Sequence, residues 1–294
     1  MSTLLILQGF AYGIIVGAVY ALLGCSLNVL YGVLRVVNFA HGEFIIAGTF
    51  VSYVLFNALH LHPLAALPVA AVSFFAAGWC LYYLLVPRLR AADDPELSSF
   101  LMMYGISLMA AAMMLGLFGA DARNISYTFQ PIAVRVGPVF LPTARLVALA
   151  VSLVIGGALA WFFYRTLPGK ALRAAIMNPE AIQIVGVDIN RLSALAFGLA
   201  AGLAGATGVL VGLVFPAFTP FSGPDYTLIG FIVIVLGGLG HPIGALLGGV
   251  LFGLAEQMST VFMPQALSPI VGFALLIGVI FLRPSGLMGR VQLR

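Results

Sequence analysis

The sequence has very little charge. Only 7% of its 294 residues are Asp, Glu, Lys or Arg, and it contains a single lysine, Lys170. Soluble domains carry about a quarter charged residues, so this composition excludes an ordinary soluble protein. Hydrophobic residues make up 62% of the chain, which indicates an integral membrane protein. The net charge of +4 is better explained by basic anchors in loops than by nucleic-acid binding.

Motifs for chemistry are also missing. The sequence has no HExxH, no GxSxG and no GxxxxGK[ST] loop, so we expect neither ATP hydrolysis nor another enzymatic activity from this chain. Cys25 and Cys80 lie in apolar stretches, where a thiol usually behaves as a small hydrophobic group. No metal site, cofactor or disulfide is predicted. The first charged residue is Arg35, so we expect the N-terminus to remain as the first span rather than as a cleaved signal peptide.

Long charge-free stretches predict the membrane spans, each judged against the roughly 20 apolar residues that cross a bilayer. They predict an all-α integral membrane protein, a single domain over residues 1–294 with about eight transmembrane helices. The glycine-rich run GGLGHPIGALLGG interrupts one stretch, which should form two shorter pieces that cross twice or re-enter. The stretches are Met1–Leu34, Phe44–Pro87 (two spans dividing near Asn57–Pro63), Leu97–Ala120, Leu146–Tyr164, Leu192–Pro224, Tyr226–Ala255 and Gln257–Leu282.

Small residues in the stretch Leu192–Pro224 are spaced to lie on one broad helical face. Because no hydrophobic force drives helices together inside a bilayer, such a face favours close backbone packing. The residues are Gly198, Gly202, Gly205, Gly208 and Gly212.

The basic residues predict the orientation, since they accumulate on the cytoplasmic side. A cytoplasmic loop at 165–191 and a cytoplasmic C-terminal tail leave the N-terminus outside. The outer loop 119–143 is then either a small platform or a plain connection. The ten basic residues assigned to the cytoplasm are Arg35, Arg88, Arg90, the four of the 165–191 loop, Arg283, Arg290 and Arg294, and those outside are Arg123, Arg135 and Arg145.

The segment Arg165–Arg191 predicts a short, sharply bounded surface helix. Asn178 is suited to accept hydrogen bonds from the first free amides, and Pro179 follows where no amide hydrogen is needed. Glu180 lies at the positive end of the helix dipole, and Gly186 is suited to the left-handed conformation that ends helices. A solvated connector with no further role is the alternative.

Glu180, Ala181 and Gly186 reproduce most of an EAA---G pattern, although Ile182 replaces its second alanine. The segment therefore resembles the cytoplasmic coupling loop of ATP-binding-cassette importer permeases. The resemblance implies that the helix docks in a cleft of a separate ATPase subunit. The residues it would use for this coupling are Arg173, Asn178, Pro179, Glu180, Ala181 and Gly186.

Polar residues also interrupt the apolar stretch Tyr31–Gly48. Such groups are costly in hydrocarbon, so they either face a solute pathway or form a turn at the cytoplasmic interface. We favour the pathway, because broken helices in transporters expose polar backbone only where it lines a cavity. No sequence repeat between the two halves is evident. The predicted pathway residues are Asn38, His41 and Glu43, with Gly237, Gly238 and Gly240 from the glycine-rich break.

The run NFAHGE followed by an apolar span looks like the signature of LivH-type permeases of branched-chain amino acid importers. YALLGCSLNVLYG and VLGGLGHPIGALLGG extend the resemblance over nearly the full chain, although His241 departs from the small or polar residue expected there. We expect His241 to be a helix-end residue.

This resemblance implies a permease subunit in a bacterial-type inner membrane that translocates branched-chain or other hydrophobic amino acids. Its implied partners are a second permease subunit, two ATPase subunits and an extracytoplasmic solute-binding protein. Urea or a short-chain amide is the alternative solute. A stand-alone secondary transporter or channel is the alternative class of protein.

Overall fold

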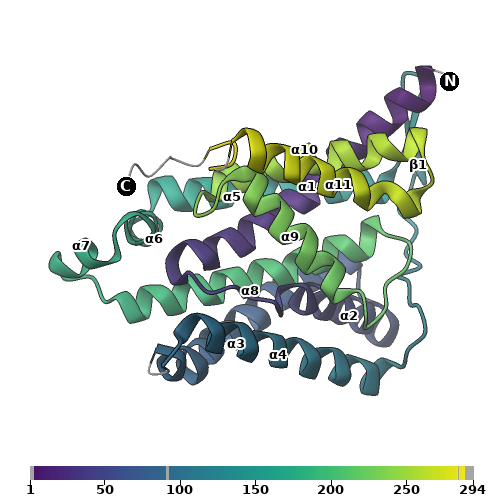
Figure 1. Ribbon diagram of the computed structural model, residues 1–294. Helices are drawn as coiled ribbons and strands as arrows, with labels where there is room; N and C mark the ends of the chain where they lie inside the picture. The colour runs from purple at the N-terminus through teal and green to yellow at the C-terminus, as the bar shows by residue number, and fades with distance from the viewer. Residues whose placement is uncertain (1–2, 91–92, 284, 289–294) are drawn as a thin grey trace.

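The computed structural model describes residues 3–90, 93–283 and 285–288, and over these ranges the chain is a bundle of helices with one short hairpin (Figure 1). Seven of the described helices are long and apolar enough to cross a membrane, and the shorter apolar helices α9 and α11 lie beside them. The predicted all-α membrane bundle is confirmed. The helices of the first half are α1 (Thr3–Leu34), α2 (His41–Leu59), η1 (Pro63–Ala65), α3 (Ala66–Arg90) and α4 (Pro95–Phe118).

The hairpin β1 (Ala133–Val136) and β2 (Val139–Pro142) comes next. It is followed by α5 (Thr143–Arg165), α6 (Leu167–Met177), α7 (Pro179–Ile184), α8 (Ile189–Val214), α9 (Gly223–Gly237), α10 (Pro242–Phe262), η2 (Gln265–Leu267) and α11 (Ser268–Leu282). Figure 1 places α6 and α7 at one end of the bundle and the hairpin with the N-terminus at the other. These are called the α7 end and the hairpin end below. Arg290 and Arg294 of the predicted basic tail lie outside the described residues.

The observed helices follow the predicted spans except near the C-terminus. The stretch 44–87 divides into α2 and α3 at a turn that follows Leu59, and the glycine-rich stretch breaks between α9 and α10, as expected. However, α10 continues past Ala255 to Phe262, where the sequence suggested a boundary. The polar residue at that boundary, Glu256, lies inside the helix, where its carboxylate faces the Tyr20 hydroxyl of α1.

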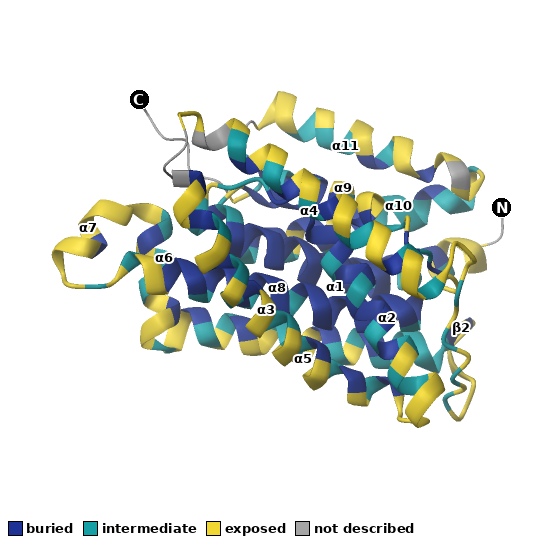
Figure 2. Cartoon of the chain, turned by 90° about the horizontal axis from the view of Figure 1, so that it is seen from below, coloured by how far each residue is buried: buried dark blue, intermediate teal, exposed yellow. Residues whose placement is uncertain are grey.

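The centre of the bundle is formed by α1 and α8, which are the most buried of the long helices (Figure 2). On α8 the predicted glycine face is confirmed. A Cβ at Gly202 would lie 2.8 Å from the Ala71 carbonyl oxygen of α3, and one at Gly208 would lie 1.9 Å from the Ile45 carbonyl oxygen of α2. The glycines therefore let α8 contact two helices backbone to backbone.

The helix α1 packs in the same way on α10. A Cβ at Gly17 would lie 2.8 Å from Cα of Val250, and one at Gly253 would lie 2.4 Å from Cα of Gly17. Moving along α1 from Gly9 to Gly24 moves the contact from Val261 back toward Ala245, so the two helices are antiparallel.

The two halves of the chain follow similar paths in opposite directions. In the first half α1 runs to the α7 end, an extended segment turns back into the bundle, and α2 returns to the hairpin end. In the second half α8 runs to the hairpin end, residues 215–222 turn back, and α9 returns to the α7 end. Each first helix has one antiparallel neighbour from the other half, α10 on α1 and α3 on α8. Inverted halves of this kind are common in membrane transporters, and here the sequence did not reveal them.

The long loop 119–143 contains the antiparallel hairpin, in which Ala133 pairs with Pro142 and Val136 with Val139. Gly137 turns the chain with a φ of 61°. The buried side chains of β2, Val139 and Leu141, pack on Ile15 of α1. The loop is therefore an ordered cover over the end of α1 rather than a plain connection.

Candidate functional site

The helix α7 has the caps that its sequence predicts. The Asn178 side-chain oxygen accepts hydrogen bonds from the backbone N–H groups of Glu180 and Ala181, each at 3.0 Å. Pro179 occupies the first helical position, and Gly186 has a φ of 83°, the left-handed conformation expected after the helix. The short helix is thus held at both ends by its own residues, and it projects from the bundle (Figures 1 and 2).

The residue that departs from the coupling pattern, Ile182, is the anchor of α7. Its side chain is 5% exposed and packs into the main hydrophobic core. Beside it, Ile184 and Val185 are 87% and 74% exposed. Large apolar side chains that are exposed together on a protein mark an interaction surface. The α7 helix therefore presents an apolar knob that the bundle itself does not cover.

The helix α6, which precedes α7, was not predicted from the sequence. Thr166 caps it by accepting a hydrogen bond from the N–H of Gly169 at 3.2 Å, and a proline follows at its start, so the signal in the sequence was a normal helix start. Arg173 lies on α6, where its guanidinium group stacks 4.3 Å above the ring of Tyr164 in α5. This residue fastens α6 to the bundle and is not part of the projecting knob.

One side chain of α6 reaches the interior of the bundle. A Cβ at Gly32 of α1 would lie 3.1 Å from Ile176, and a Cβ at Gly240 would lie 3.3 Å from the same side chain. Ile176 therefore touches both the end of α1 and the break between α9 and α10. The α6–α7 segment is in direct contact with the broken helix.

That break is held by Asn28, a buried residue of α1. Its side-chain NH₂ donates to the backbone carbonyls of Gly238 and His241, both at 3.0 Å, and its side-chain oxygen accepts from the N–H of Gly240 at 2.7 Å. Gly238 and Gly240 have φ angles of 105° and 76°. One side chain thus satisfies three backbone groups that the break sets free inside an apolar bundle.

Asn28 was missed by the sequence analysis, although a lone amide inside the apolar run SLNVL was the available signal. His241 is the residue before α10 and its side chain makes no capping bond, so it is a helix-end residue as predicted. Gly237 is packed tightly, because its Cβ would lie 2.4 Å from the carbonyl carbon of Gly244. Gly237, Gly238 and Gly240 therefore lie at the α7 end against protein, and their place on the solute pathway stays a prediction.

The other three predicted pathway residues lie together where the start of α2 meets the start of α9. We call residues 38–43 and 223–227 the polar junction. The His41 imidazole is 2.7 Å from the Ser26 hydroxyl of α1, and the N–H of Gly42 donates to the Thr227 hydroxyl at 2.8 Å. That hydroxyl donates in turn to the carbonyl of Phe39 at 3.1 Å. Ser26 and Thr227 were not predicted as site residues.

The polar junction is deep inside the bundle. With a rise of about 1.5 Å per residue, Glu43 lies about 24 Å along α2 from its end at Leu59. Ser26, the partner of His41, lies about 12 Å along α1 from its end at Leu34. Both ends of the membrane-spanning region are therefore well separated from the junction.

Two side chains of the junction are buried without full partners. Asn38, His41 and Glu43 are each at most 1% exposed. Within the described residues, Nδ1 of His41 and both carboxylate oxygens of Glu43 have no partner in hydrogen-bond geometry, although Ser107 of α4 faces Glu43. A Cβ at Gly223 would lie 2.7 Å from the Glu43 carboxylate, which therefore points at the start of α9. Buried groups of this kind are costly in an apolar interior unless water or a ligand reaches them.

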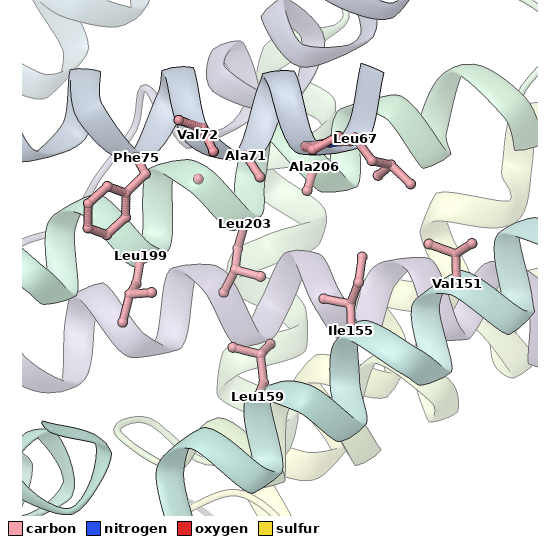
Figure 3. Close-up of a pocket in the computed structure, with 12 residues that line it drawn as sticks. Leu67, Ala71, Val72, Phe75, Val151, Ile155, Leu159, Leu199, Leu203 and Ala206 are labelled. Carbon is pink, nitrogen blue, oxygen red and sulfur yellow. The ribbon is translucent and has the colours of Figure 1, made fainter. Parts of the chain in front are cut away.

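A second feature, an apolar cavity of about 480 Å³, lies between α3, α5 and α8 (Figure 3). Val72 and Phe75 of α3 line one side, Ile155 and Leu159 of α5 line the other, and Leu203 of α8 lies between them. The residues that line it are all apolar, so a charged or zwitterionic solute would find no hydrogen-bond or ionic partner among their side chains. The polar junction is therefore the candidate solute site of this chain.

Comparison with known proteins places these features in a family. Residues 9–280 match the family described as "Branched-chain amino acid transport system / permease component". The chain is 28% identical to the high-affinity branched-chain amino acid transport system permease protein BraD of Pseudomonas aeruginosa, over 97% of this chain and 96% of that protein. It is equally similar, 28% over the same shares, to LivH of Escherichia coli K12. It is 26% identical to the permease protein LivM of that organism, over 94% of this chain and 69% of LivM.

Proposed function

The chain belongs to the family of branched-chain amino acid transport system permease components, and from that premise we propose that it is a permease subunit of an ATP-driven importer. Its solutes are branched-chain or other hydrophobic amino acids. The observation that carries the proposal is the family match over residues 9–280, because that range includes both the projecting α7 helix and the polar junction. The chain itself is a transport subunit and not an enzyme.

The energy for transport comes from two separate ATPase subunits that dock on α7. Support comes from the exposed pair Ile184 and Val185, which needs an apolar cleft to cover it. Asn178, Pro179 and Gly186 keep the helix rigid, while Glu180 and Ala181 lie on its exposed surface. Arg173 contributes by holding α6 on Tyr164 rather than by touching the ATPase.

Motion of the docked helix reaches the bundle through Ile176. Its contacts with Gly32 and Gly240 connect α6 to the end of α1 and to the break before α10. Because Asn28 ties that break to α1 through three hydrogen bonds, the two move as one unit. A displacement of α6 is therefore transmitted to the helices that carry Ser26 and Gly223 of the polar junction.

The α7 end is cytoplasmic and the chain lies in a bacterial-type inner membrane. The backbone N–H groups of Leu287 and Met288 bond to the carbonyls of Leu236 and Gly237, beside the break that Ile176 touches. The chain after α11 therefore lies at the α7 end up to Met288, which supports a cytoplasmic C-terminal tail and two crossings, one by residues 215–237 and one by α10. The hairpin and the N-terminus then face outward.

The complete importer contains a second permease subunit and an extracytoplasmic solute-binding protein. The similarity of this chain to both LivH and LivM supports a pair of related permeases with the solute route between them. The route passes the polar junction, where His41 and Glu43 offer buried groups without partners. Selectivity comes largely from the external binding protein.

Reconstituted transport tests this function. Proteoliposomes that contain the full complex should take up labelled leucine only when binding protein is outside and ATP is inside. Uptake of urea without uptake of leucine would overturn the solute class. Uptake of leucine without ATP would overturn the importer mechanism and favour a stand-alone transporter.

A further inference from the structure

Asp225, in the first turn of α9, is an exposed carboxylate far from either end of the bundle. The other exposed carboxylates with described side chains all lie at the two ends, in loops or on α7: Asp93, Asp94, Asp121, Glu180 and Asp188. Asp225 follows Gly223 by about 3 Å along α9, and Gly223 lies against Glu43 in the polar junction. Its depth is therefore that of the junction, inside the membrane-spanning region.

The Asp225 carboxylate is unsuited to a position that faces lipid. An ionised aspartate facing hydrocarbon is costly, and its side chain is too short to reach the aqueous interface from this depth. Within the described residues Asp225 has neither a hydrogen bond nor an ion pair. At comparable depth on another helix, the exposed side chains are apolar, as Leu153 and Val154 of α5 show at 64% and 71% exposure. The α9 face that carries Asp225 therefore suits water or protein, whereas the exposed face of α5 suits lipid.

A second carboxylate, that of Glu43, points at the start of α9 from inside the bundle. Glu43 is 1% exposed, has no partner in hydrogen-bond geometry within the described residues, and points at Gly223. The two acidic residues occupy matching positions, since each is the third residue of the helix that restarts after an extended segment, Glu43 in α2 and Asp225 in α9. One lies inside the junction and the other on its outer surface.

We propose that Asp225 lines the solute route, on the face of α9 turned toward the second permease subunit, and binds the ammonium group of the amino acid. This inference rests on the proposed function, because it takes the solute to be a zwitterion. An unpaired carboxylate attracts a cationic group, and the low dielectric of the surrounding helices strengthens that attraction. No side chain caps the start of α9 within the described residues, so its first backbone N–H groups suit the carboxylate end of the same solute. Two nearby carboxylates give no such advantage to urea, which is neutral.

Labelling with a charged thiol reagent tests the location of Asp225 whatever solute the complex carries. Asp225→Cys, in a chain with Cys25 and Cys80 replaced, should react with 2-sulfonatoethyl methanethiosulfonate in proteoliposomes of the full complex. The matched control is Leu153→Cys, which is exposed at the middle of α5 and should stay unreacted because lipid covers it. An inert Asp225→Cys would overturn the proposal.

Leucine uptake tests the role of the charge. Asp225→Asn should lower uptake at least tenfold while the complex still assembles and hydrolyses ATP, and Asp225→Glu should recover most of the activity. Asp121→Asn, in the exposed outer loop, is the matched control and should transport normally. Unchanged uptake in Asp225→Asn would overturn the proposal even if the cysteine is labelled.

The remaining explanation is structural, because an aspartate in the first turn also stabilises a helix through its dipole. That role predicts a loss of folded complex in Asp225→Asn together with an unlabelled cysteine, and this result would overturn the proposal. Failure of the proposed function gives a different pattern. The complex would then transport urea and not leucine, while the labelling experiment would still report whether Asp225 faces water.

Discussion

The break between α9 and α10 and the polar junction differ in how their polar groups are satisfied. At the break between α9 and α10, Asn28 pairs with three backbone groups. At the polar junction, Nδ1 of His41 and the carboxylate of Glu43 lack partners within the described residues. A fully paired interruption is a rigid joint, whereas buried groups without partners are suited to meet a solute. This difference supports our proposal that the break transmits motion and that the polar junction meets the solute.

Replacement of Asn28 should have the largest effect on stability. Asn28→Leu leaves three buried backbone groups without partners at about 1–3 kcal/mol each, so the free energy of unfolding should fall by more than about 3 kcal/mol. Thermal unfolding of the purified subunit and its level in membranes measure this loss. Asn57→Leu, an exposed asparagine on α2, is the control. Equal unfolding temperatures for both variants would contradict the description of the break as a fully paired joint.

Truncation of Ile176 should have a smaller effect on stability and a large one on coupling. Ile176→Ala removes a partly buried side chain, so the expected loss is about 1–2 kcal/mol. Because α6 then no longer fills the space beside Gly32 and Gly240, the complex should hydrolyse ATP with little leucine uptake. The ratio of uptake to hydrolysis is the measurement. Ile184→Ala serves as a control that changes ATPase docking instead, and an unaltered ratio in Ile176→Ala would remove the break from the transmission path.

Gly186→Pro should lower the free energy of unfolding by less than Ile176→Ala does, because Gly186 is exposed and lies outside the bundle. Proline fixes φ near −65° and cannot adopt the observed 83°, so the end of α7 must rearrange. The chain should still insert and unfold at nearly the same temperature, but transport should be uncoupled from ATP hydrolysis. Crosslinking from a cysteine at Gln183 to an ATPase subunit should be lost in this variant. Persistent crosslinks with normal uptake would show that the shape of α7 is not required.

Glu43→Gln should have the smallest effect on stability, and unlike the other three changes it should not destabilise the protein. Glutamine replaces a buried carboxyl group that has no partner in hydrogen-bond geometry within the described residues, so the free energy of unfolding should stay unchanged or rise by about 1 kcal/mol. Leucine uptake should nevertheless fall, because the junction loses a carboxyl group that can ionise when water or solute reaches it. Unfolding temperature and uptake, measured on the same preparation, check both parts. A strongly destabilised Glu43→Gln would mean that the carboxylate is a structural partner, and the contrast with Asn28 would disappear.

Local patterns allowed much of the fold to be predicted. Asn178, Pro179 and Gly186 determine the limits of α7 by short-range hydrogen bonding and backbone preference, so the prediction was confirmed in detail. The break after Gly237 was also predicted, because the glycine-rich run indicated an interrupted helix. The start of α6 was overlooked although its Thr166 cap is an equally local signal.

The candidate site was only half predictable. Asn38, His41 and Glu43 are close in sequence, so their grouping needed no knowledge of the fold. Ser26, Thr227 and Asp225 are distant from them in the chain. Nothing local indicates that α1 and α9 place Ser26 and Thr227 in the junction and Asp225 on its outer surface. The pathway role of Gly237, Gly238 and Gly240 stays a prediction, since they lie packed at the α7 end.

By itself, the sequence determined the membrane-spanning class, most of the spans, the capped α7 helix and the glycine face of α8, because each depends on composition or on residues close together in the chain. Tertiary structure alone decided that Asn28 closes the break, that Ile176 reaches it, and that the two restarting helices meet with Glu43 inside and Asp225 outside. The physical reason is distance along the chain. Inside a bilayer every interrupted backbone group needs a partner, and only the folded bundle determines which remote side chain supplies it.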